Sequence, residues 1–248
     1  MKRNIFAGIL ALAIGMMSYI WTASAQSPVS APVVLELYTS QGCSSCPPAD
    51  DLLRSYAKRK DIVALSFNVD YWDYLGWKDT LANPAYSIRQ RAYARARGDG
   101  EVYTPQVVVN GRAHAVGSVA QQIENAISAT TKDGQHASVP LTVQFRGGKL
   151  RVEVGAGTTG KPTRPATIWL AAVRRQVTVP VQHGENRGRM LSYYNVVHRL
   201  TPVGIWAGEK KVIELMDEDV LQGKADTCAI LVQDGKGGPI IAARWMEG

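Results

Sequence analysis

Hydrophobic and polar residues alternate along the first half of the chain in two patterns, one typical of buried strands and one typical of helices. Apolar runs predict strands over residues 33–38, 62–69, 106–109 and 113–116. Apolar residues at helical spacing predict helices over residues 49–59, 84–97 and 119–127, the last capped by Ser118. The Asn110-Gly111 pair predicts a hairpin turn between the last two strands. Because the first helix connects the first two strands, we expect those strands to be parallel.

The second half of the chain has mainly strand signals. Apolar and β-branched runs predict strands over residues 141–145, 150–154, 166–173, 191–200, 211–215, 228–233 and 240–245. Gly147-Gly148 and Gly237-Gly238 are typical of hairpin turns. Seven strands separated by turns are typical of a β-sandwich. We therefore predict an α/β domain over residues 26–136, followed by an all-β, sandwich-like domain over residues 137–248.

The first 25 residues have the pattern of a secretory signal peptide. Lys2 and Arg3 precede an apolar run over residues 5–21, and Ala23-Ser24-Ala25 supplies the small residues of a cleavage site. Cleavage there predicts a periplasmic or secreted protein that is not attached to a membrane. The alternative is an uncleaved anchor, since the apolar run is only slightly too short to cross a bilayer comfortably.

The charge pattern argues against a nucleic-acid-binding function. The formal net charge is +7, and Lys2 and Arg3 contribute two of these charges. Residues 26–136 hold eleven basic and eleven acidic residues, whereas residues 137–248 hold fifteen and ten. The basic residues form no long run and no aromatic-basic RNA motif. Predicted export points in the same direction.

Two cysteines with two residues between them lie where the first strand leads into the first helix. A thiol at a helix N-terminus is stabilised as a thiolate by the helix dipole and by free backbone N–H groups. Cys43 is therefore the candidate attacking thiol and the more exposed one, and Cys46 the resolving thiol. A structural disulfide or half of a zinc site is the alternative, although no second such pair and no nearby histidine pair follows. The third cysteine, Cys228, is expected to be a buried, unbonded residue.

Two further residues are candidates for this chemistry. Glu36 interrupts the first apolar run, and a buried carboxylate close to a dithiol could accept a proton from the resolving thiol. A half-exposed glutamate without such a role is the alternative. Pro105 stands directly before a strongly apolar strand, where proline is tolerated at the first position. A cis Thr104–Pro105 bond would bring backbone groups up to the dithiol.

Two loops are candidates for contacts with a partner. Residues 70–77 hold four aromatic residues, among them Trp72 and Trp77, which either pack over the site or form a cluster beneath a long loop. Residues 183–189 form a polar, glycine-containing loop with His183, Arg187 and Arg189. Arginines bind carboxylates in a bidentate manner, so this loop could receive an acidic peptide, although solvated turn residues explain the same pattern.

The order of elements over residues 31–131 resembles thioredoxin. Cys43 and Cys46 match its redox pair, Pro105 its cis-proline, and Glu36 its buried acidic residue. The motifs GCSSCPPAD, VDYWDYLGWKD, YTPQVVVNG and HGENRGR also resemble a family of secreted bacterial thioredoxin-like proteins, catalogued as domain of unknown function 1223. The resemblance implies a fold and a compartment but no particular substrate.

We therefore expect an exported thiol-disulfide oxidoreductase without a cofactor, whose partners are thiols or disulfides of exported proteins and a second redox protein. Electron flow in either direction is compatible with the sequence. One alternative is a copper-handling protein that binds a soft ion through Cys43 and Cys46. The other is an interaction module without catalytic activity on the same scaffold.

Overall fold

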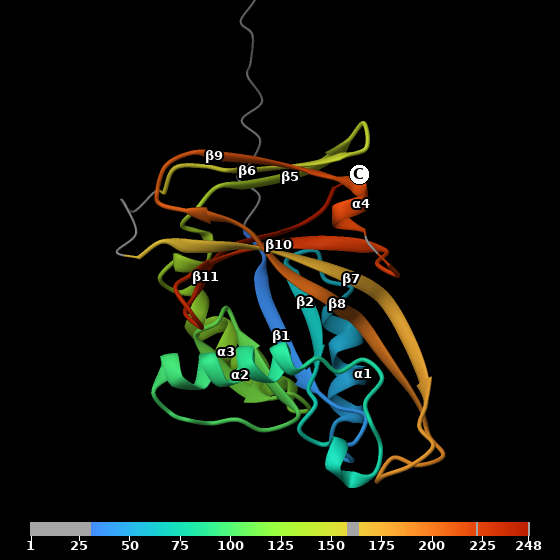
Figure 1. Cartoon of the computed structure of the whole chain (residues 1–248). Coiled ribbons are helices and arrows are strands. Elements are labelled where there is room, and N and C mark those ends of the chain that lie inside the picture. Colours follow the sequence, from blue (N-terminus) through green and yellow to red (C-terminus); the bar gives the residue numbers. More distant parts are fainter. Residues whose placement is uncertain (1–30, 158–163, 222, 248) are drawn as a thin grey trace, which may run out of the picture.

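The computed structural model describes residues 31–157, 164–221 and 223–247 (Figure 1). The predicted signal peptide lies outside these residues. No helix within the described ranges is long and apolar enough to cross a membrane.

Eight strands form one mixed sheet in the order β11-β10-β7-β8-β2-β1-β3-β4. Its strands are β1 (Val33–Thr39), β2 (Ile62–Asn68), β3 (Gln106–Val109), β4 (Ala113–Val116), β7 (Ala166–Pro180), β8 (Met190–Trp206), β10 (Thr227–Asp234) and β11 (Ile240–Trp245). A second sheet contains β5 (Leu141–Arg146), β6 (Lys149–Val154) and β9 (Lys211–Met216). The helices are α1 (Pro47–Tyr56), α2 (Pro84–Arg97), α3 (Ala120–Thr131) and α4 (Asp217–Val220), with 3-10 turns η1 (Asp73–Leu75) and η2 (Gln135–Ala137).

The strands and helices predicted for the first half are present, although α1 ends at Tyr56 instead of residue 59, α3 continues to Thr131, and one cap differs. Strands β1 and β2 are parallel and joined through α1, and β3 is antiparallel to β1. Asn110 and Gly111 both have positive φ, 49° and 67°, as the predicted hairpin turn between β3 and β4 requires. The prediction for Ser118 is wrong, because α3 begins one residue later with Val119 at its N-cap and no side-chain cap.

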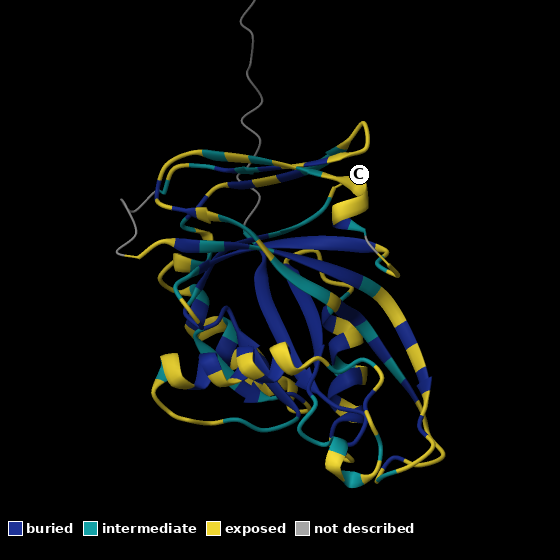
Figure 2. Ribbon diagram, viewed as in Figure 1, coloured by how far each residue is buried: buried dark blue, intermediate teal, exposed yellow. Residues whose placement is uncertain are grey.

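Strand β1 divides the core of the first half, because alternate residues of a strand point to opposite faces of the sheet. Leu35 and Leu37 face a core with α1 and α3. Val34 and Tyr38 face a second core with α2, which contributes Tyr86 and Tyr93. Helices therefore cover both faces of this part of the sheet, and its central strands are buried throughout (Figure 2).

The sheet continues across the predicted domain boundary at residues 136 and 137, because β8 pairs with β2 in parallel between Ser66 and Val196. The separate β-sandwich predicted for residues 137–248 is not confirmed. Four of its strands extend the first sheet, and the sheet β5-β6-β9 packs against them. Strand β10 is buried on both faces, with Leu231 toward the α2 core and Ile230 toward the small sheet. Sequence periodicity could not reveal that the sheet is continuous, because it indicates which residues of a strand are buried but not which other strand pairs with it.

Strands β7 and β8 form a hairpin that is longer than predicted. It extends along α1, where the Arg54 guanidinium lies 5.4 Å from the centre of the Tyr194 ring (Figure 1). Residues 181–189 connect the two strands, and we refer to them as the hairpin tip. The tip is closed by backbone hydrogen bonds from Val181 to Arg189 and from Gly188 to Val181.

Candidate functional site

Cys43 and Cys46 form a disulfide directly before α1, with their Cα atoms 5.4 Å apart. Helix α1 begins at Pro47, where the missing N–H breaks no helical hydrogen bond. Ser44 and Ser45 are exposed, but Cys43 and Cys46 are only 1% and 0% exposed. The expected difference in exposure between the two cysteines is therefore absent from the disulfide form.

Few hydrogen-bond donors are available to the Cys43 sulfur. Pro47 and Pro48 contribute no N–H to the first turn of α1. The backbone N–H of Cys46 donates to the Cys43 carbonyl, at 3.2 Å. The Ser45 hydroxyl lies 3.4 Å from the Cys43 sulfur, so it can donate a hydrogen bond to a thiolate.

We refer to residues 41–46, which carry both cysteines, as the dithiol turn. Trp72 connects this turn to the segment before β3. Its Cβ lies against Gly42, where an added Cβ would lie 3.0 Å from it, so a larger residue there would require Trp72 to shift. Its indole N–H donates to the Thr104 hydroxyl at 2.7 Å, and the Thr104–Pro105 bond is cis, as predicted. Gly117 faces both Pro105 and Ala49 of α1, so the proline lies beside the dithiol helix.

The hairpin tip contacts the same turn from the other end of the sequence. The Asn186 side-chain amide donates to the carbonyls of Gln41 and Cys43, both at 2.9 Å. The Glu185 carboxylate accepts from the backbone N–H of Ser44, at 3.3 Å. The sequence identified this loop as a candidate for partner contacts but did not predict that Glu185 and Asn186 bind the dithiol turn, because that contact depends on how the hairpin packs.

The loop residues predicted as partner contacts largely surround the dithiol. Trp77 donates to the Gln41 side chain at 2.8 Å, and its ring lies 6.1 Å from that of His183. Arg189 donates to the Asn186 side-chain oxygen, at 2.9 Å. Arg187 is exposed and only its backbone N–H closes the loop, onto Gly184.

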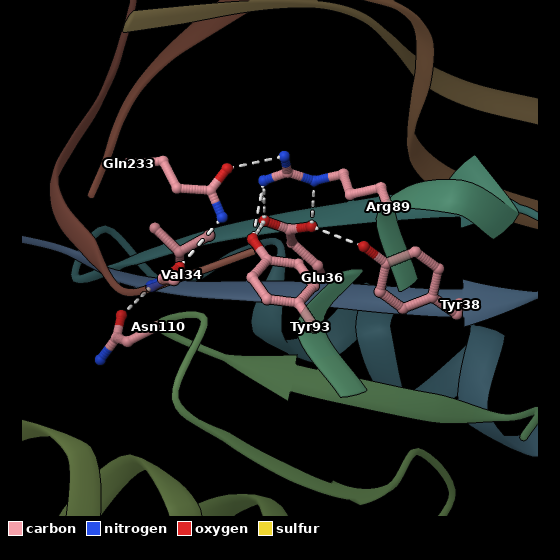
Figure 3. Close-up of polar contacts among 8 residues, drawn as sticks. Val34, Glu36, Tyr38, Arg89, Tyr93, Asn110 and Gln233 are labelled. Atoms are coloured by element: carbon pink, nitrogen blue, oxygen red, sulfur yellow. Dashed lines mark hydrogen bonds and ion pairs between the residues drawn. The ribbon is translucent and has the colours of Figure 1, made fainter. Parts of the chain in front are cut away.

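Glu36 does not lie at the dithiol, so its predicted role in proton transfer is wrong. It points to the face of the sheet covered by α2, whereas α1 lies on the opposite face. Both carboxylate oxygens accept from Arg89, at 2.7 and 2.8 Å, and Tyr38 and Tyr93 donate to them as well (Figure 3). Arg89 also donates to Gln233 of β10. This buried ion pair therefore joins α2, β1 and the second half of the chain.

Asp50 is the buried carboxyl group closest to Cys46 along α1. Its backbone N–H donates to the Cys46 carbonyl, and side chains four residues apart share one face of a helix. The side chain is 4% exposed, and neither carboxyl oxygen has a hydrogen-bond partner among the described residues. Burial raises the pKa of Asp50 well above its ordinary value, and the charge of the nearby Asp79 adds to this shift.

Asp79 lies in the same buried region but in a different environment. Its carboxylate accepts hydrogen bonds from the backbone N–H groups of Gln41 and Leu81 and from the Asn68 side chain. Burial raises the pKa of Asp79, but these donors oppose the shift because they stabilise the ionised form. Of the two carboxyl groups, Asp50 is therefore the one suited to hold a proton.

The sequence left open whether the cysteines bind a metal ion, and it predicted that Cys228 is an unbonded thiol. Across the described ranges, no group of three or more histidine, cysteine or acidic side chains is arranged to hold a metal ion. Cys228 is unbonded and buried in β10, as predicted, and burial raises the pKa of its thiol to about 12.

The chain was compared with known proteins. A protein from Agrobacterium tumefaciens with a known crystal structure is 36% identical in sequence to this chain. The two structures match with a TM-score of 0.76, over 88% of this chain and 95% of the other chain. HBP35 of Porphyromonas gingivalis shares the fold at 14% identity and a TM-score of 0.60, over 87% of this chain and 74% of its own. No curated protein matches the sequence significantly. The sequence matches the family described as "Protein of unknown function (DUF1223)" over residues 34–233, and the protein therefore belongs to that family.

Proposed function

We propose that the protein is a thiol-disulfide oxidoreductase and that residues 31–131 form a thioredoxin-like unit within the larger sheet. The observation that carries the proposal is the Cys43–Cys46 disulfide at the start of α1, with the cis Thr104–Pro105 bond close to the same helix. A dithiol at a helix N-terminus favours thiolate chemistry. The signal sequence and the disulfide agree with action on exported proteins in the periplasm or outside the cell.

The exchange proceeds in two balanced steps. The Cys43 thiolate attacks one sulfur of a substrate disulfide, which forms a mixed disulfide and releases the other substrate sulfur as a thiolate. The Cys46 thiolate then attacks the Cys43 sulfur, which forms the Cys43–Cys46 disulfide and releases the second substrate thiolate. The substrate gains two electrons and the protein dithiol loses two. The reverse sequence oxidises a substrate dithiol, and a second redox protein restores the starting state.

Asp50 fits the role of proton acceptor for Cys46 that the sequence had suggested for Glu36. Cys46 must lose a proton before it attacks, and it is fully buried, so solvent water is a poor acceptor. A buried carboxyl group whose pKa is raised toward the working pH exchanges protons readily. The negative charge of Asp79 adds to the rise in the pKa of Asp50.

The proposal is tested by trapping partners with Cys46→Ser, which stops the reaction at the mixed disulfide. Expressed in the exported form, this variant should accumulate protein adducts that disappear on reduction. Cys43→Ser combined with Cys46→Ser should trap none, and Cys228→Ser in the Cys46→Ser background should trap the same set. Equal adducts in all three strains would contradict the proposal.

A further inference from the structure

The hairpin tip covers the dithiol through side chains more than 140 residues away in the sequence. Asn186 is fully buried although it lies on a loop whose neighbours Glu185 and Arg187 are exposed. Its two N–H groups hold the carbonyls of Gln41 and Cys43, and its oxygen accepts from Arg189. Both N–H groups of this amide thus join the tip to the turn that carries Cys43, and its oxygen is held within the tip by Arg189.

Glu185 acts on the same turn through its charge. Its carboxylate accepts the backbone N–H of Ser44, a donor that would otherwise be free at the start of α1. A negative charge at a helix N-terminus opposes formation of a second one, so Glu185 makes a Cys43 thiolate less stable. The other charged groups around the dithiol are the buried Asp50 and Asp79 beneath it and the exposed Arg187 and Arg189 on the tip.

We propose that the hairpin tip is a built-in cap on the dithiol, in which Asn186 positions Cys43 and restricts access to it, while Glu185 destabilises the Cys43 thiolate. The inference rests on the proposed function only in taking the dithiol as the reactive site. Its consequence is a direction of electron flow. A stable thiolate stabilises the reduced form of the dithiol. Because the cap makes the thiolate less stable, it favours the disulfide form and therefore a dithiol that donates electrons over one that is a strong oxidant.

The charge of Glu185 is tested with Glu185→Gln, an exposed substitution that leaves the fold intact. The fraction of Cys43 present as thiolate at neutral pH should rise about two- to fivefold, the effect of one charge near an exposed helix terminus. The equilibrium with glutathione should shift in the same direction, toward the reduced protein, by no more than the change in the acid dissociation constant of Cys43, because only the thiolate part of the reduced protein gains stability. Because salt screens exposed charges, both differences should shrink in molar salt. Glu218→Gln, an equally exposed change on α4, is the matched control and should alter neither quantity.

The positioning role of Asn186 is tested with Asn186→Ala, using the rate at which dithiothreitol reduces the disulfide. Loss of two hydrogen bonds should open the cap more often and raise this rate about tenfold. Gln182→Ala, at an exposed position of the same tip, should leave the rate unchanged. Thiolate fraction and small-thiol rates are measured without a protein partner, so they remain informative even if trapping finds none.

Two results would overturn the cap. One concerns the Cys43 thiolate fraction in Glu185→Gln: it equals the wild-type fraction at low salt, or it differs from the wild-type fraction by the same amount at low and at high salt. The other is an unchanged rate of reduction in a folded Asn186→Ala protein. If Asn186→Ala does not fold, the Glu185→Gln result alone decides, because that side chain is exposed and contributes little to stability.

Discussion

At the scale of single residues, the two buried acids of the first half have opposite environments. Glu36 forms a buried ion pair with Arg89 and accepts four hydrogen bonds, so its side chain is held in place by its partners. Asp50 has no such partners within the described residues, and burial therefore favours its protonated form. Of these two buried carboxyl groups, one is thus held in an ion pair, and the other is available for the proposed proton transfer.

We expect Asp50→Asn to slow resolution and to stabilise the fold. Burial raises the pKa of Asp50, so between its unfolded and folded values the native state holds a proton that the unfolded chain has lost. Wild-type stability therefore decreases as pH rises through this window, and the variant lacks this loss. The free energy of unfolding of Asp50→Asn should therefore exceed that of the wild type by an amount that grows as the pH rises from about 4, the ordinary carboxyl pKa, toward neutral. Urea unfolding at several pH values measures it, and a constant difference would contradict the assignment.

Glu36→Gln should destabilise the protein without slowing disulfide exchange. Removing the carboxylate leaves the Arg89 guanidinium buried and unpaired, at a cost of about 3 kcal/mol. Urea unfolding measures this loss, and single-turnover exchange kinetics should be unaffected. Glu36→Leu combined with Arg89→Met removes both charges and should recover part of the stability. Slowed exchange in a fully folded Glu36→Gln protein would restore the role in proton transfer.

At the scale of elements, the β7–β8 hairpin and the loop of residues 70–77 with its four aromatic residues, the aromatic loop, support each other. Side chains of β7 and β8 pack into a small core that includes Trp77 and Leu81 from the loop before α2. Trp77 also bonds to Gln41 and contacts His183. One indole therefore joins three segments: the dithiol turn, the aromatic loop and the hairpin tip.

Trp77→Ala should loosen the dithiol turn and the hairpin tip together. Because both lose the same packing and hydrogen bond, amide hydrogen exchange at residues 41–46 and 181–189 should accelerate about tenfold or more, equivalent to about 1.4 kcal/mol. Exchange in β10, on the far side of β7, should not change. Trp77→Phe keeps most of the packing and should show a smaller effect. Acceleration at only one of the two segments would show that they are not coupled through this side chain.

At the scale of the whole molecule, the second half completes the core of the first. The face of the sheet under α2 combines Phe67 and Tyr86 with Val173, Val197 and Leu231 from β7, β8 and β10. Arg89 of α2 reaches Gln233 in the same region. The two halves are therefore parts of one hydrophobic core on this face.

A fragment of residues 31–136 should not fold by itself. Its α2 core would lose the side chains of β7, β8 and β10, and β2 would become an unpaired edge strand prone to association. We expect no cooperative thermal transition by circular dichroism, in contrast to the chain without its first 25 residues. A cooperative transition of the isolated fragment would support the domain boundary that the sequence suggested.

Local signals determined the elements around the dithiol. The apolar run of β1, the helical spacing after Pro48, and the Asn110-Gly111 turn are properties of neighbouring residues, and the structure contains each of them. The pairing of Cys43 with Cys46 is also local, because their separation allows a bridge without help from the rest of the chain. The parallel pairing of β1 with β2 and the hairpin of β3 and β4 follow from these signals, whereas the pairing of β3 with β1 was seen only in the structure.

Tertiary structure alone decided what surrounds the dithiol. Strand periodicity gives burial but not the neighbouring strand, so the sequence separated the second half from a sheet that in fact includes it. It could not tell that Glu36 faces α2 while Asp50 is buried on the first turn of α1 after Cys46, because the pattern of neighbouring residues does not say what packs over an acidic side chain. Asn186 reaches the Cys43 carbonyl only because a long hairpin crosses beside α1, and no pattern within the sequence carries that contact.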